Sequence, residues 1–562
     1  ATEDELRKAD SLSTGYNWRD NTWEIIVKYS GSLESIRNRY NVYIKELLNY
    51  YAIIVADKAT IELISQEDVI DYVEKPKSLY YQIERTKTAA CVGSVRADGN
   101  ILSGKGVIVG VIDTGIDIFD NAFRNSDGTT RILNIYDQTT GEKYDKQSID
   151  EYIRLNEDLS GGTFSYDNAP GVDNIMHGTD VSYIAAGSLG VAYEADIIAV
   201  KMGYSINNQF PRTTSLMDAI DYIIRKAIEY RKPVAVNISY GCNYGAHNGN
   251  TLLESFIDDI SKSYRCVICV GSGNEADKAI HFGGIINTGQ VQTAYLSVGE
   301  YQSAIDIQIW KNYWDTIDVM LINPRGEQIG IITEGRINRY ETYNTEIITL
   351  LGEPSPYNIY QEIYINLIPK TDYILSGIWQ IVLMAGSIRA GEYNIWLPSS
   401  QALGYATAFN NPTADGTITI PATARNCIAV GAYNAYTNSY AAFSGRGFDN
   451  SIRNVNAGVK PDITAPGVDI SIARQRGNDI TYRNVTGTSY AVPVVTGAAA
   501  LLMQWGIVMG NDRFMYGEKL KAALIDGSKP VGLVGITRND NQPDPRTGWG
   551  AVCLKNTLNK IL

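Results

Sequence analysis

Three residues whose side chains could together cleave an acyl bond are spread widely along this chain of 562 residues. Asp113 ends an apolar run in VIDTGID, His177 precedes small residues in NIMHGTDVSYIAAG, and Ser489 stands in GTSYAVP. A serine hydroxyl becomes a nucleophile when an imidazole takes its proton, and a carboxylate can orient that imidazole. The three residue types therefore predict nucleophilic catalysis, provided that the fold brings them together.

Ser489 and Asn274 both occupy positions where an oxyanion could be held. Ser489 begins the apolar stretch SYAVPVVTGAAALL, and the N-terminus of such a helix would offer backbone N–H groups to a developing oxyanion. Asn274 ends RCVICVGSGN and could donate its side-chain N–H to the same oxygen. Each residue also has a simpler structural interpretation, because serine is a common N-cap of helices and asparagine is common in turns. The chain order Asp, His, Asn, Ser favours the catalytic reading.

The sequence Asp-Thr-Gly at Asp113 also occurs in aspartic proteases, which need two such carboxylates side by side. Three other sequences that contain Asp-Gly, at residues 97–99, 126–128 and 414–416, do not follow apolar strands. An aspartic site would therefore require a dimer, which makes this the weaker alternative.

Histidine is scarce, with three in the whole chain. His247 and His281 lie in stretches rich in Gly and Asn, so we expect both to be solvated at the surface. His177 directly precedes a helical stretch of small residues, in the same part of the chain as Asp113. It is therefore the candidate general base.

The six cysteines are too few and too scattered for a disulfide scaffold. Cys266 and Cys269 have the spacing of a metal or redox pair, but they lie in RCVICVGSG, an apolar run typical of a strand. Residues three apart on a strand point to opposite faces, so the two thiols cannot readily share a metal. We expect them to be buried packing residues.

The candidate residues need a scaffold, and the apolar segments from Gly104 onward predict one. We expect strands at residues 104–117, 195–202, 233–241 and 265–274, and helices at 180–187 and 215–230. Fully apolar strands separated by helices indicate an α/β fold with a parallel sheet covered on both faces. Ligands of such sheets bind at the carboxyl ends of the strands, which is where Asp113 and Asn274 would lie.

Two other parts of the chain have different patterns. Residues 22–82 read as a βαββαβ unit, which suits a small ferredoxin-like α+β module. Residues 279–411 alternate between strands and turns, which predicts an all-β sandwich or jelly roll inserted into the α/β domain. The predicted organisation is an N-terminal extension (1–21), the small module (22–82), a first catalytic part (83–278), the inserted sandwich (279–411) and a second catalytic part (412–562).

Composition argues against several functions. The net charge of −13 and the lack of a dense Lys/Arg cluster argue against nucleic-acid binding. No apolar run reaches the roughly 18 residues of a membrane span, and the nearest one, AAALLMQWGIVMG, suits a buried core helix better. The polar start ATEDELRKAD shows no signal peptide. We therefore expect neither a nucleic-acid partner nor a membrane span.

The segments that hold the candidate residues resemble the four signature blocks of the subtilisin-like serine proteases, or subtilases. These segments are VIDTGID, HGTDV, GSGNEA and GTSYAVPVVTGAAALL. Three further segments, VNISYG, KPDITAPG and GWGAVCLKNTL, resemble other parts of the same family. A sandwich inserted after the asparagine block, together with a retained propeptide, is similar to the clostridial germination-specific, Csp-type members.

The resemblance implies a serine endopeptidase that acts through an acyl-enzyme. Ser489 would attack the scissile carbonyl, His177 would act as general base and then acid, and Asp113 would orient the imidazole. Asn274 would bind the oxyanion. A protein or peptide substrate would pair by strand addition with a segment that consists of Ser239, Tyr240 and Gly241.

The resemblance also implies that residues 22–82 are a propeptide of a self-processing zymogen, which acts as a chaperone and then as a bound inhibitor. The expected cleavage region consists of Tyr81, Gln82, Ile83, Glu84, Arg85 and Thr86. The protein is expected to be bacterial, spore-associated or extracellular, and to activate another protein by limited proteolysis in spore germination. The alternative is a subtilase fold kept as a binding or sensor scaffold, against which the presence of all the catalytic residue types argues.

Three positions depart from the family's pattern. Asp180 stands where a second histidine is usual, and Tyr490 stands where methionine is usual. Asp180 adds negative charge one helical turn from His177, and we expect it to raise the imidazole pKa if the two are close. Ala122 takes the place of an aspartate of the family's strong calcium site, and a loop of that site is missing. We therefore expect no metal and no cofactor requirement.

Overall fold

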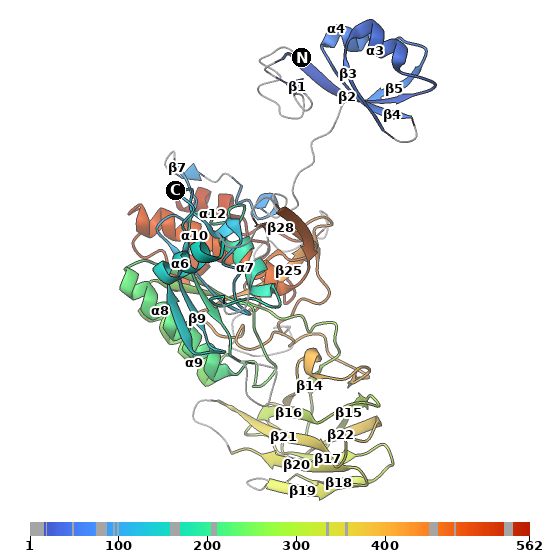
Figure 1. Ribbon diagram of the computed structural model, residues 1–562. Coiled ribbons are helices and arrows are strands. Elements are labelled where there is room, and N and C mark those ends of the chain that lie inside the picture. The colour runs from blue at the N-terminus through green and yellow to red at the C-terminus, as the bar shows by residue number, and fades with distance from the viewer. Residues whose placement is uncertain are drawn as a thin grey trace. The chain divides into compact units, whose positions relative to one another are not determined.

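The computed structural model places the chain in two compact units, Ala1–Tyr81 and Gln82–Leu562 (Figure 1). The residues that it describes are 16–17, 20–47, 50–74, 87–93, 96–97, 100–157, 169–203, 211–332, 337–353, 358–448, 459–476, 479–532 and 543–562. The candidate residues Asp113, His177, Asn274 and Ser489 all belong to the second unit.

The first unit is a five-stranded antiparallel sheet with two helices. Its strand order is β1-β2-β4-β3, with β5 paired to β2, so the four longer strands follow the ferredoxin-like order predicted for this module. Alternate residues of β2 and β4 are buried and pack with helix residues in a separate core. The elements are β1 (Tyr16–Asn17), β2 (Thr22–Tyr29), α3 (Glu34–Tyr40), β3 (Tyr43–Leu47), β4 (Tyr51–Ala56), α4 (Lys58–Ile64) and β5 (Ile70–Glu74).

The second unit is built around a nine-stranded sheet of order β10-β9-β11-β8-β12-β13-β25-β26, with β27 paired to β25. The pairings from β9 through β25 are parallel, and β8, β12 and β13 are buried along their whole length. Their carboxyl ends therefore meet at one edge of the sheet, as predicted. The strands are β8 (Ile108–Asp113), β9 (Ile132–Asp137), β10 (Glu142–Asp145), β11 (Asp196–Lys201), β12 (Val234–Ile238), β13 (Cys266–Gly271), β25 (Ile428–Asn434), β26 (Ser439–Tyr440) and β27 (Ile463–Pro466).

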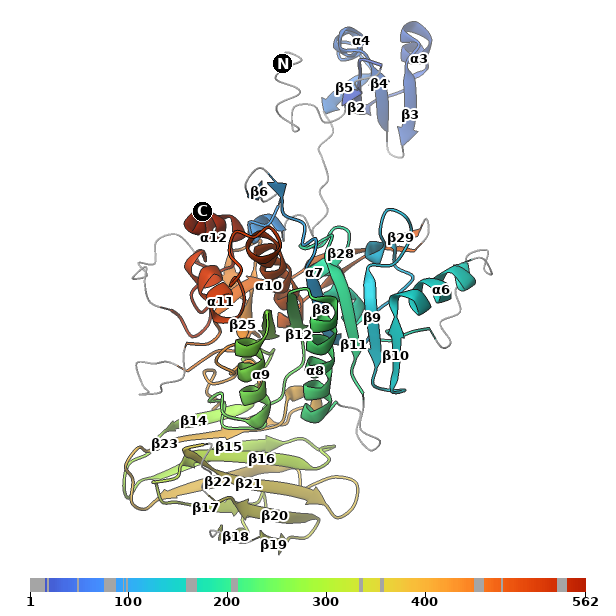
Figure 2. The same ribbon diagram turned by 90° about the vertical axis from the view of Figure 1, so that its left-hand side faces the viewer.

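Helices cover both faces of this sheet (Figure 2). One core holds α7 (His177–Ala186) and α10 (Thr488–Met503), and the core on the opposite face holds α8 (Thr213–Tyr230) and α9 (Leu252–Ser263). The architecture is therefore the predicted α/β sheet with two helical layers. The other helical elements of this unit are η1 (Asn121–Phe123), α6 (Lys146–Glu157), η2 (Ser400–Ala402), the π-helical turn η3 (Gln504–Val508), α11 (Gly517–Asp526) and α12 (Leu554–Ile561).

From Ala491 onward helix α10 is mostly apolar and is buried on all sides. A Cβ on Gly497 would lie 2.5 Å from the Cβ of Val191, so the helix packs closer than a larger residue would allow. Together with the π-helical turn that follows it, the helix spans Thr488–Val508 and is long and apolar enough to cross a membrane. However, 89% of its most apolar 18-residue segment is buried inside this fold, as is typical of a core helix.

Cys266 and Cys269 lie on opposite faces of β13, as their spacing predicts. Cys266 belongs to the core with α8 and α9, whereas Cys269 belongs to the core with α7 and α10. Both thiols are fully buried, and burial raises the pKa of each to about 12. They are therefore packing residues, as expected.

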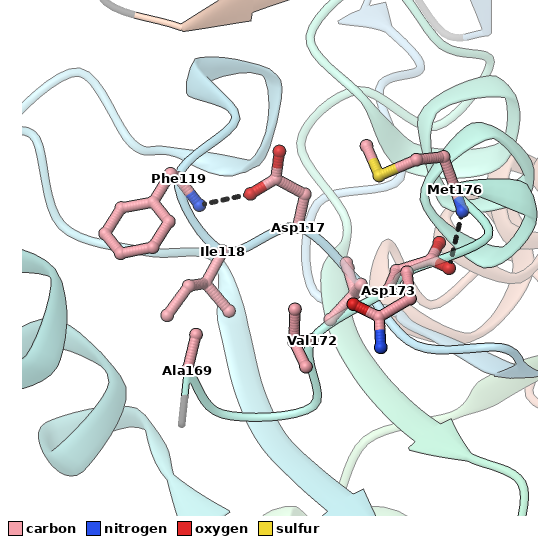
Figure 3. A pocket seen from close by; sticks show the side chains of 9 residues that line it. Asp117, Ile118, Phe119, Ala169, Val172, Asp173 and Met176 are labelled. Atoms are coloured by element: carbon pink, nitrogen blue, oxygen red, sulfur yellow. Dashed lines mark hydrogen bonds between the residues drawn. The ribbon is translucent and has the colours of Figure 1, made fainter. Parts of the chain in front are cut away.

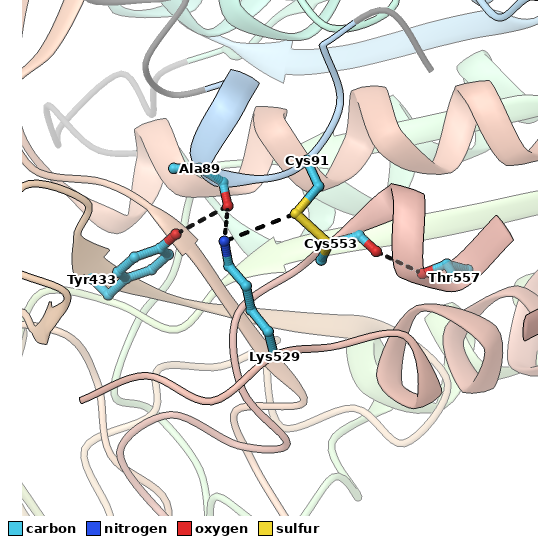
Figure 4. The surroundings of a disulfide bond; sticks show 6 residues. All are labelled: Ala89, Cys91, Tyr433, Lys529, Cys553 and Thr557. Atoms are coloured by element: carbon cyan, nitrogen blue, oxygen red, sulfur yellow. Dashed lines mark hydrogen bonds between the residues drawn. A yellow bond between two sulfur atoms is a disulfide. The ribbon is translucent and has the colours of Figure 1, made fainter. Parts of the chain in front are cut away.

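A disulfide bond joins Cys91 and Cys553, which the sequence analysis did not predict (Figure 4). The two residues are 462 positions apart, so their spacing carries no signal. The bond attaches the segment that precedes the central sheet to the start of α12. Beside it, Nζ of Lys529 donates a hydrogen bond to the carbonyl oxygen of Ala89 at 2.6 Å.

The inserted segment is an antiparallel sandwich, as predicted. One sheet has the order β14-β23-β16-β21-β20-β19 and the other has the order β18-β17-β22-β15-β24. Buried residues alternate along the strands and meet in one core between the sheets. The strands are β14 (His281–Ile285), β15 (Val291–Val298), β16 (Ile305–Asn312), β17 (Ile317–Ile322), β18 (Gln328–Ile331), β19 (Ile337–Glu341), β20 (Thr345–Leu351), β21 (Tyr360–Pro369), β22 (Gly377–Ala385), β23 (Glu392–Trp396) and β24 (Ala408–Phe409).

The expectation that His247 and His281 are solvated is wrong. Their exposed fractions are 4% and 0%, and both rings stack on Trp396, at centroid distances of 4.1 and 4.8 Å. His247 comes from the loop between β12 and α9, whereas His281 and Trp396 come from the sandwich. The neighbouring Gly and Asn residues mark a loop correctly at His247, whereas His281 is the first residue of strand β14, and both rings are buried against Trp396 of the inserted sandwich.

A small hairpin, β28 (Ile470–Arg476) and β29 (Asp479–Val485), lies beside α7 (Figure 1). A second short pair is formed by β6 (Arg96–Ala97) and β7 (Asn100–Ile101). The β28–β29 hairpin contributes to the surroundings of His177.

Candidate active site

Asp113 and His177 form a hydrogen-bonded pair at the carboxyl edge of the sheet. Asp113 is the last residue of β8 and is 1% exposed, and His177 is the first residue of α7. Nδ1 of the imidazole lies 2.6 Å from Oδ1 of Asp113, which also accepts a hydrogen bond from the N–H of Thr114 at 2.8 Å. The carboxylate favours the tautomer protonated on Nδ1, so Nε2 is the atom that can accept a proton.

The pKa of His177 lies above its ordinary value of 6.5. Burial is the largest single influence and lowers this pKa, but the charge of Asp113, its hydrogen bond and the charge of Asp173 together raise it above that value. The more distant carboxylate of Asp173 adds to the increase, and the guanidinium of Arg483 opposes it. An imidazole in this setting is a stronger base than a solvated one.

A second buried carboxylate, Asp173, builds the turn that precedes His177 (Figure 3). Its Oδ1 accepts hydrogen bonds from the hydroxyl of Thr114 at 2.8 Å and the N–H of Met176 at 2.7 Å. Its Oδ2 accepts from the N–H and the hydroxyl of Thr179, both at 2.8 Å. Asp173 thus ties the end of β8 to the first turn of α7. The sequence does not identify Asp173 as a functional residue, because its position four residues before His177 is the only indication.

A cavity of about 210 Å³ lies beside this turn, and Figure 3 shows the side chains that line it. Its wall is mostly apolar, from Ile118, Phe119 and Val172, with the carboxylates of Asp117 and Asp173 at its edge.

Ser489 lies in the first turn of α10, after Gly487, whose φ of +153° favours glycine. Its carbonyl oxygen accepts a hydrogen bond from Oγ of Ser239 at 3.3 Å. Helix α10 packs against α7, which carries His177. Among the described residues no hydrogen bond joins Oγ of Ser489 to the imidazole, and such contacts are often long in enzymes without substrate.

Tyr490, which the sequence left unexplained, packs against the imidazole. The ring centroids of Tyr490 and His177 lie 5.3 Å apart with an angle of 54° between the planes. Burial raises the pKa of the phenol, so the ring is neutral at ordinary pH. The ring of Tyr490 thus provides a large apolar surface next to His177, at the position where the family usually has methionine.

The side chain of Asn274 is oriented by the start of α10. Its Oδ1 accepts hydrogen bonds from the N–H and the hydroxyl of Thr488, at 3.0 and 3.1 Å. Nδ2 therefore points the other way, and a Cβ on Gly487 would lie 3.6 Å from it. The amide can donate a hydrogen bond beside the Ser489 backbone.

The segment Ser239 to Gly241 follows β12 directly. Oγ of Ser239 accepts a hydrogen bond from Nδ2 of Asn237 at 3.0 Å, and the segment is thereby tied to the sheet. A Cβ on Gly241 would lie 2.5 Å from Oγ1 of Thr419, so a side chain there would collide. Among the described residues, Ser239 and Gly241 make no backbone–backbone hydrogen bond. Their peptide groups are available to an extended ligand.

Asp180 does not act on the imidazole as expected. It is 0% exposed and forms ion pairs with Arg474 and Arg483 of the β28–β29 hairpin. The charges that act on the imidazole come from the two carboxylates described above and from Arg483. The negative charge of Asp180 is compensated locally, so its proximity in sequence does not translate into a higher pKa of His177.

Within the described ranges, no group of three or more His, Cys, Asp or Glu residues is placed to hold a metal ion. Ala122 lies in η1 and is buried, and its N–H donates a hydrogen bond to Oδ1 of Asp120 at 2.9 Å. The methyl group of Ala122 offers no ligand atom.

Sheet, helices and candidate residues together define a class of protein. The order Asp, His, Ser along the chain distinguishes the subtilisin arrangement from the other folds that carry these three residues. The fold is that of a subtilisin-like serine protease, and the candidate residues follow the chain order of that class.

Comparisons with known protein families and structures give the same class. Residues 104–354 and 390–550 match the subtilase family, and residues 1–77 match the Csp protease B prodomain. The structure of the Clostridium perfringens CspB protease is 34% identical, with a TM-score of 0.76, over 85% of this chain and 97% of that chain. The chain therefore belongs to the subtilase family of serine endopeptidases, and its N-terminal unit is a prodomain of the Csp protease B type.

Two curated relatives match over shorter stretches. The subtilase-type proteinase RRT12 of Saccharomyces cerevisiae is 33% identical over 128 residues, which are 22% of this chain and 23% of the relative. Subtilisin-like protease 10 of Arthroderma otae is 34% identical over 120 residues, which are 21% of this chain and 27% of the relative. The match spans about a quarter of the length of each relative.

Proposed function

We propose that this chain hydrolyses peptide bonds of a protein substrate through an acyl-enzyme, with Ser489 as nucleophile, His177 as general base and Asp113 as its orienting carboxylate. The observation that carries the proposal is the 2.6 Å hydrogen bond between Nδ1 of His177 and the buried carboxylate of Asp113. A carboxylate in this position favours the tautomer that accepts a proton on Nε2 and stabilises the imidazolium that results.

The reaction takes place in two halves. Oγ of Ser489 bonds to the carbonyl carbon while its proton passes to Nε2 of His177, and the carbonyl oxygen takes the displaced electron pair. The C–N bond then breaks, and the imidazolium gives its proton to the leaving amine. Water attacks the acyl-enzyme with the help of the same imidazole and releases the second product, which regenerates Ser489.

The oxyanion would be held by two donors at the start of α10. One is Nδ2 of Asn274, whose orientation follows from the hydrogen bonds that Oδ1 accepts from Thr488. The other is the backbone N–H of Ser489 in the first turn of the helix, where N–H groups lack intrahelical partners. Donors placed in advance stabilise the charge that develops in the transition state.

The substrate would bind as an extended strand beside Ser239, Tyr240 and Gly241. The available peptide groups of Ser239 and Gly241 and the lack of space for a side chain at Gly241 support backbone pairing there. The hydrogen bond from Ser239 to the carbonyl oxygen of Ser489 would keep the bound strand in register with the nucleophile.

The N-terminal unit would be cleaved from the enzyme by the enzyme itself and would remain as a bound inhibitor. The proposed cleavage region, Tyr81 to Thr86, falls at the division between the two compact units and lies outside the described residues. The match to a Csp protease B prodomain supports a propeptide role.

The physiological reaction we propose is limited proteolysis that activates another protein in spore germination. Support comes from the likeness to the Clostridium perfringens CspB protease over nearly the whole of that chain. If the role in germination were wrong, the proposed peptidase activity would be unaffected, because that activity depends only on the catalytic residues.

The test compares the full chain with its Ser489→Ala variant. We expect the parent to appear as two fragments divided between residues 81 and 86, as N-terminal sequencing would show, whereas the variant stays intact. A fluorophosphonate probe should label the parent and not the variant. A parent that is neither cleaved nor labelled, even after limited proteolysis of its N-terminal unit, would contradict the proposal and favour a binding scaffold.

A further inference from the structure

The β28–β29 hairpin carries two arginines on the face that packs against the catalytic part of the chain. In this ladder Ile472 pairs with Arg483, and Arg474 pairs with Thr481. Paired residues, and residues two apart on one strand, lie on the same face of a sheet. Ile472 is fully buried in the core that also holds α7, so Arg474 and Arg483 project toward that core.

Both arginines form ion pairs with Asp180 of α7. Nε of Arg474 donates a hydrogen bond to Oδ1 of Asp180 at 3.1 Å. Asp180 is 0% exposed and lies one helical turn after His177. A buried carboxylate is strongly unfavourable without a compensating charge, and the hairpin supplies two. The hairpin and α7 are thereby held together.

The same arginines also bind the backbone next to the imidazole. Nη2 of Arg474 and Nη2 of Arg483 donate hydrogen bonds to the carbonyl oxygen of Met176, at 2.9 and 3.1 Å. Met176 directly precedes His177 and has a φ of +67°, a left-handed conformation that is unfavourable for a residue with a side chain. On the other side, Asp173 accepts from the N–H of Met176. Charged side chains therefore hold both ends of a strained residue.

We infer that Arg474 and Arg483, acting through Asp180 and the carbonyl group of Met176, position the imidazole of His177. They are positioning residues, and the β28–β29 hairpin is a clamp on the first turn of α7. This inference rests on the proposed role of His177 as general base.

The charges around the imidazole give the clamp a measurable signature. The groups that face His177 from the elements packed around it are Asp113 from β8, Asp173 from the preceding turn, Arg483 from β29, Tyr490 from α10, and the compensated pair of Asp180 and Arg474. Arg483 lowers the pKa of the imidazole, against the carboxylates. An ion pair that served stability alone would change the unfolding temperature and leave the reactivity of Ser489 unchanged, whereas the charge of Arg483 acts directly on this pKa.

The first measurement follows the imidazole of His177 by NMR titration in the full chain with Ser489→Ala, so that it does not depend on proteolysis. The chain has only three histidines, and a His177→Gln variant assigns the signal. Arg483→Met should raise the titration midpoint, because a cation that opposes protonation is removed. Arg483→Lys keeps the charge and should return the midpoint to its original value.

The second measurement is the rate at which a fluorophosphonate labels Ser489 in the processed enzyme. Asp180→Asn and Arg474→Met should slow labelling by about 10- to 100-fold, because a shift of the imidazole of about 1 Å has effects of that size. The matched control is Arg339→Met, which breaks an exposed ion pair with Glu346 in the sandwich and should leave the rate unchanged.

Folded Arg483→Met and Arg474→Met variants that keep both the parent's titration midpoint and its labelling rate would overturn the clamp. If the midpoint moves as expected but the parent enzyme is never labelled, the proposed proteolysis fails and the clamp stands. Thermal unfolding of each variant shows which of them are folded at the temperature of the measurement.

Discussion

The imidazole of His247 lies face to face with the indole of Trp396, with ring centroids 4.1 Å apart and planes 16° from parallel. Its two ring nitrogens lie 2.6 Å from the carbonyl oxygen of Ile418 and 3.2 Å from that of Asn243. Burial lowers the pKa of His247 to about 4, although the two carbonyls act in the opposite direction. The ring is therefore neutral in the folded protein at ordinary pH.

Stability should fall in mild acid because of His247. The ordinary pKa of about 6.5 applies to the unfolded chain, so between pH 6.5 and 4 the unfolded state binds more protons than the folded state. Stability from this group is fully present above pH 6.5 and is lost as the pH falls toward 4. Lowering the pH from 7 to 5 should cost about 2 kcal/mol from this residue.

Urea denaturation of the parent and of His247→Gln at both pH values isolates this effect, since other titrating groups are common to both proteins. The variant should lose less stability on acidification than the parent. An equal loss in the two proteins would mean that His247 is not the group responsible.

Peptidase activity should fall on acidification with a midpoint above pH 6.5. His177 can accept the proton of Ser489 only when it is neutral, and its pKa is raised by Asp113 against the effect of burial. The fluorophosphonate labelling rate, followed as a function of pH at constant ionic strength, reports this midpoint without a natural substrate. A midpoint clearly below 6.5 would contradict the pairing of His177 with a charged Asp113.

Replacing Asn274 with alanine should lower turnover of a casein substrate by about 10²- to 10³-fold, the usual effect of losing one oxyanion donor. KM should change little, because the donor acts on charge that develops in the transition state. Asn287→Ala, which alters an exposed turn of the sandwich, is the control. Equal turnover in both variants would remove Asn274 from the oxyanion site.

Either Cys91→Ser or Cys553→Ser should lower the free energy of unfolding by about 2–5 kcal/mol, because the bond restricts the unfolded chain. The double variant should be no worse than either single one. Cys242→Ser, which changes a free cysteine, provides the matched control. Thermal unfolding with and without dithiothreitol measures the same difference in the parent, and a parent insensitive to reduction would speak against the bond.

The parts of the fold that sequence could predict are those that depend on local pattern. Continuous apolar segments such as Ile108–Asp113 specify buried parallel strands, and alternation between residues 279 and 411 specifies a sandwich. The residues proposed for catalysis could also be identified as candidates, because each ends, follows or begins a structured segment. Their order along the chain then identifies the class.

What could not be predicted depends on contacts between distant segments. The burial of His247 requires the inserted sandwich to cover its loop, and His281 is buried because it lies in a strand of that sandwich; residues nearby in the sequence indicate neither. Cys91 and Cys553 meet only after the whole second unit has folded. The role of Asp173 is equally hidden, since an aspartate in a turn before a helix has many ordinary uses.

Asp180 shows why the pKa of His177 is hard to predict from sequence. The position of Asp180 near His177 can be predicted, but the arginines that compensate its charge cannot. Its place one turn after His177 was read correctly from the sequence. The compensating Arg474 lies almost three hundred residues further along the chain, on a hairpin with no distinctive motif. Electrostatic effects on a pKa need the complete set of neighbours, and a sequence provides only the nearest ones.

The chain enters and leaves the sandwich at neighbouring points, and this allows such a large insertion to be tolerated. The N–H of Phe409 donates a hydrogen bond to the carbonyl oxygen of Ala279 at 2.9 Å, so the chain leaves the sandwich next to the point where it entered. Closing a long flexible loop costs entropy, but a segment with its own core brings its two ends together when it folds. Loops of the sandwich can therefore change in length without separating its two ends, provided that the contacts with the catalytic part are kept, such as the hydrogen bond from the N–H of Ser400 to Glu275, the neighbour of Asn274.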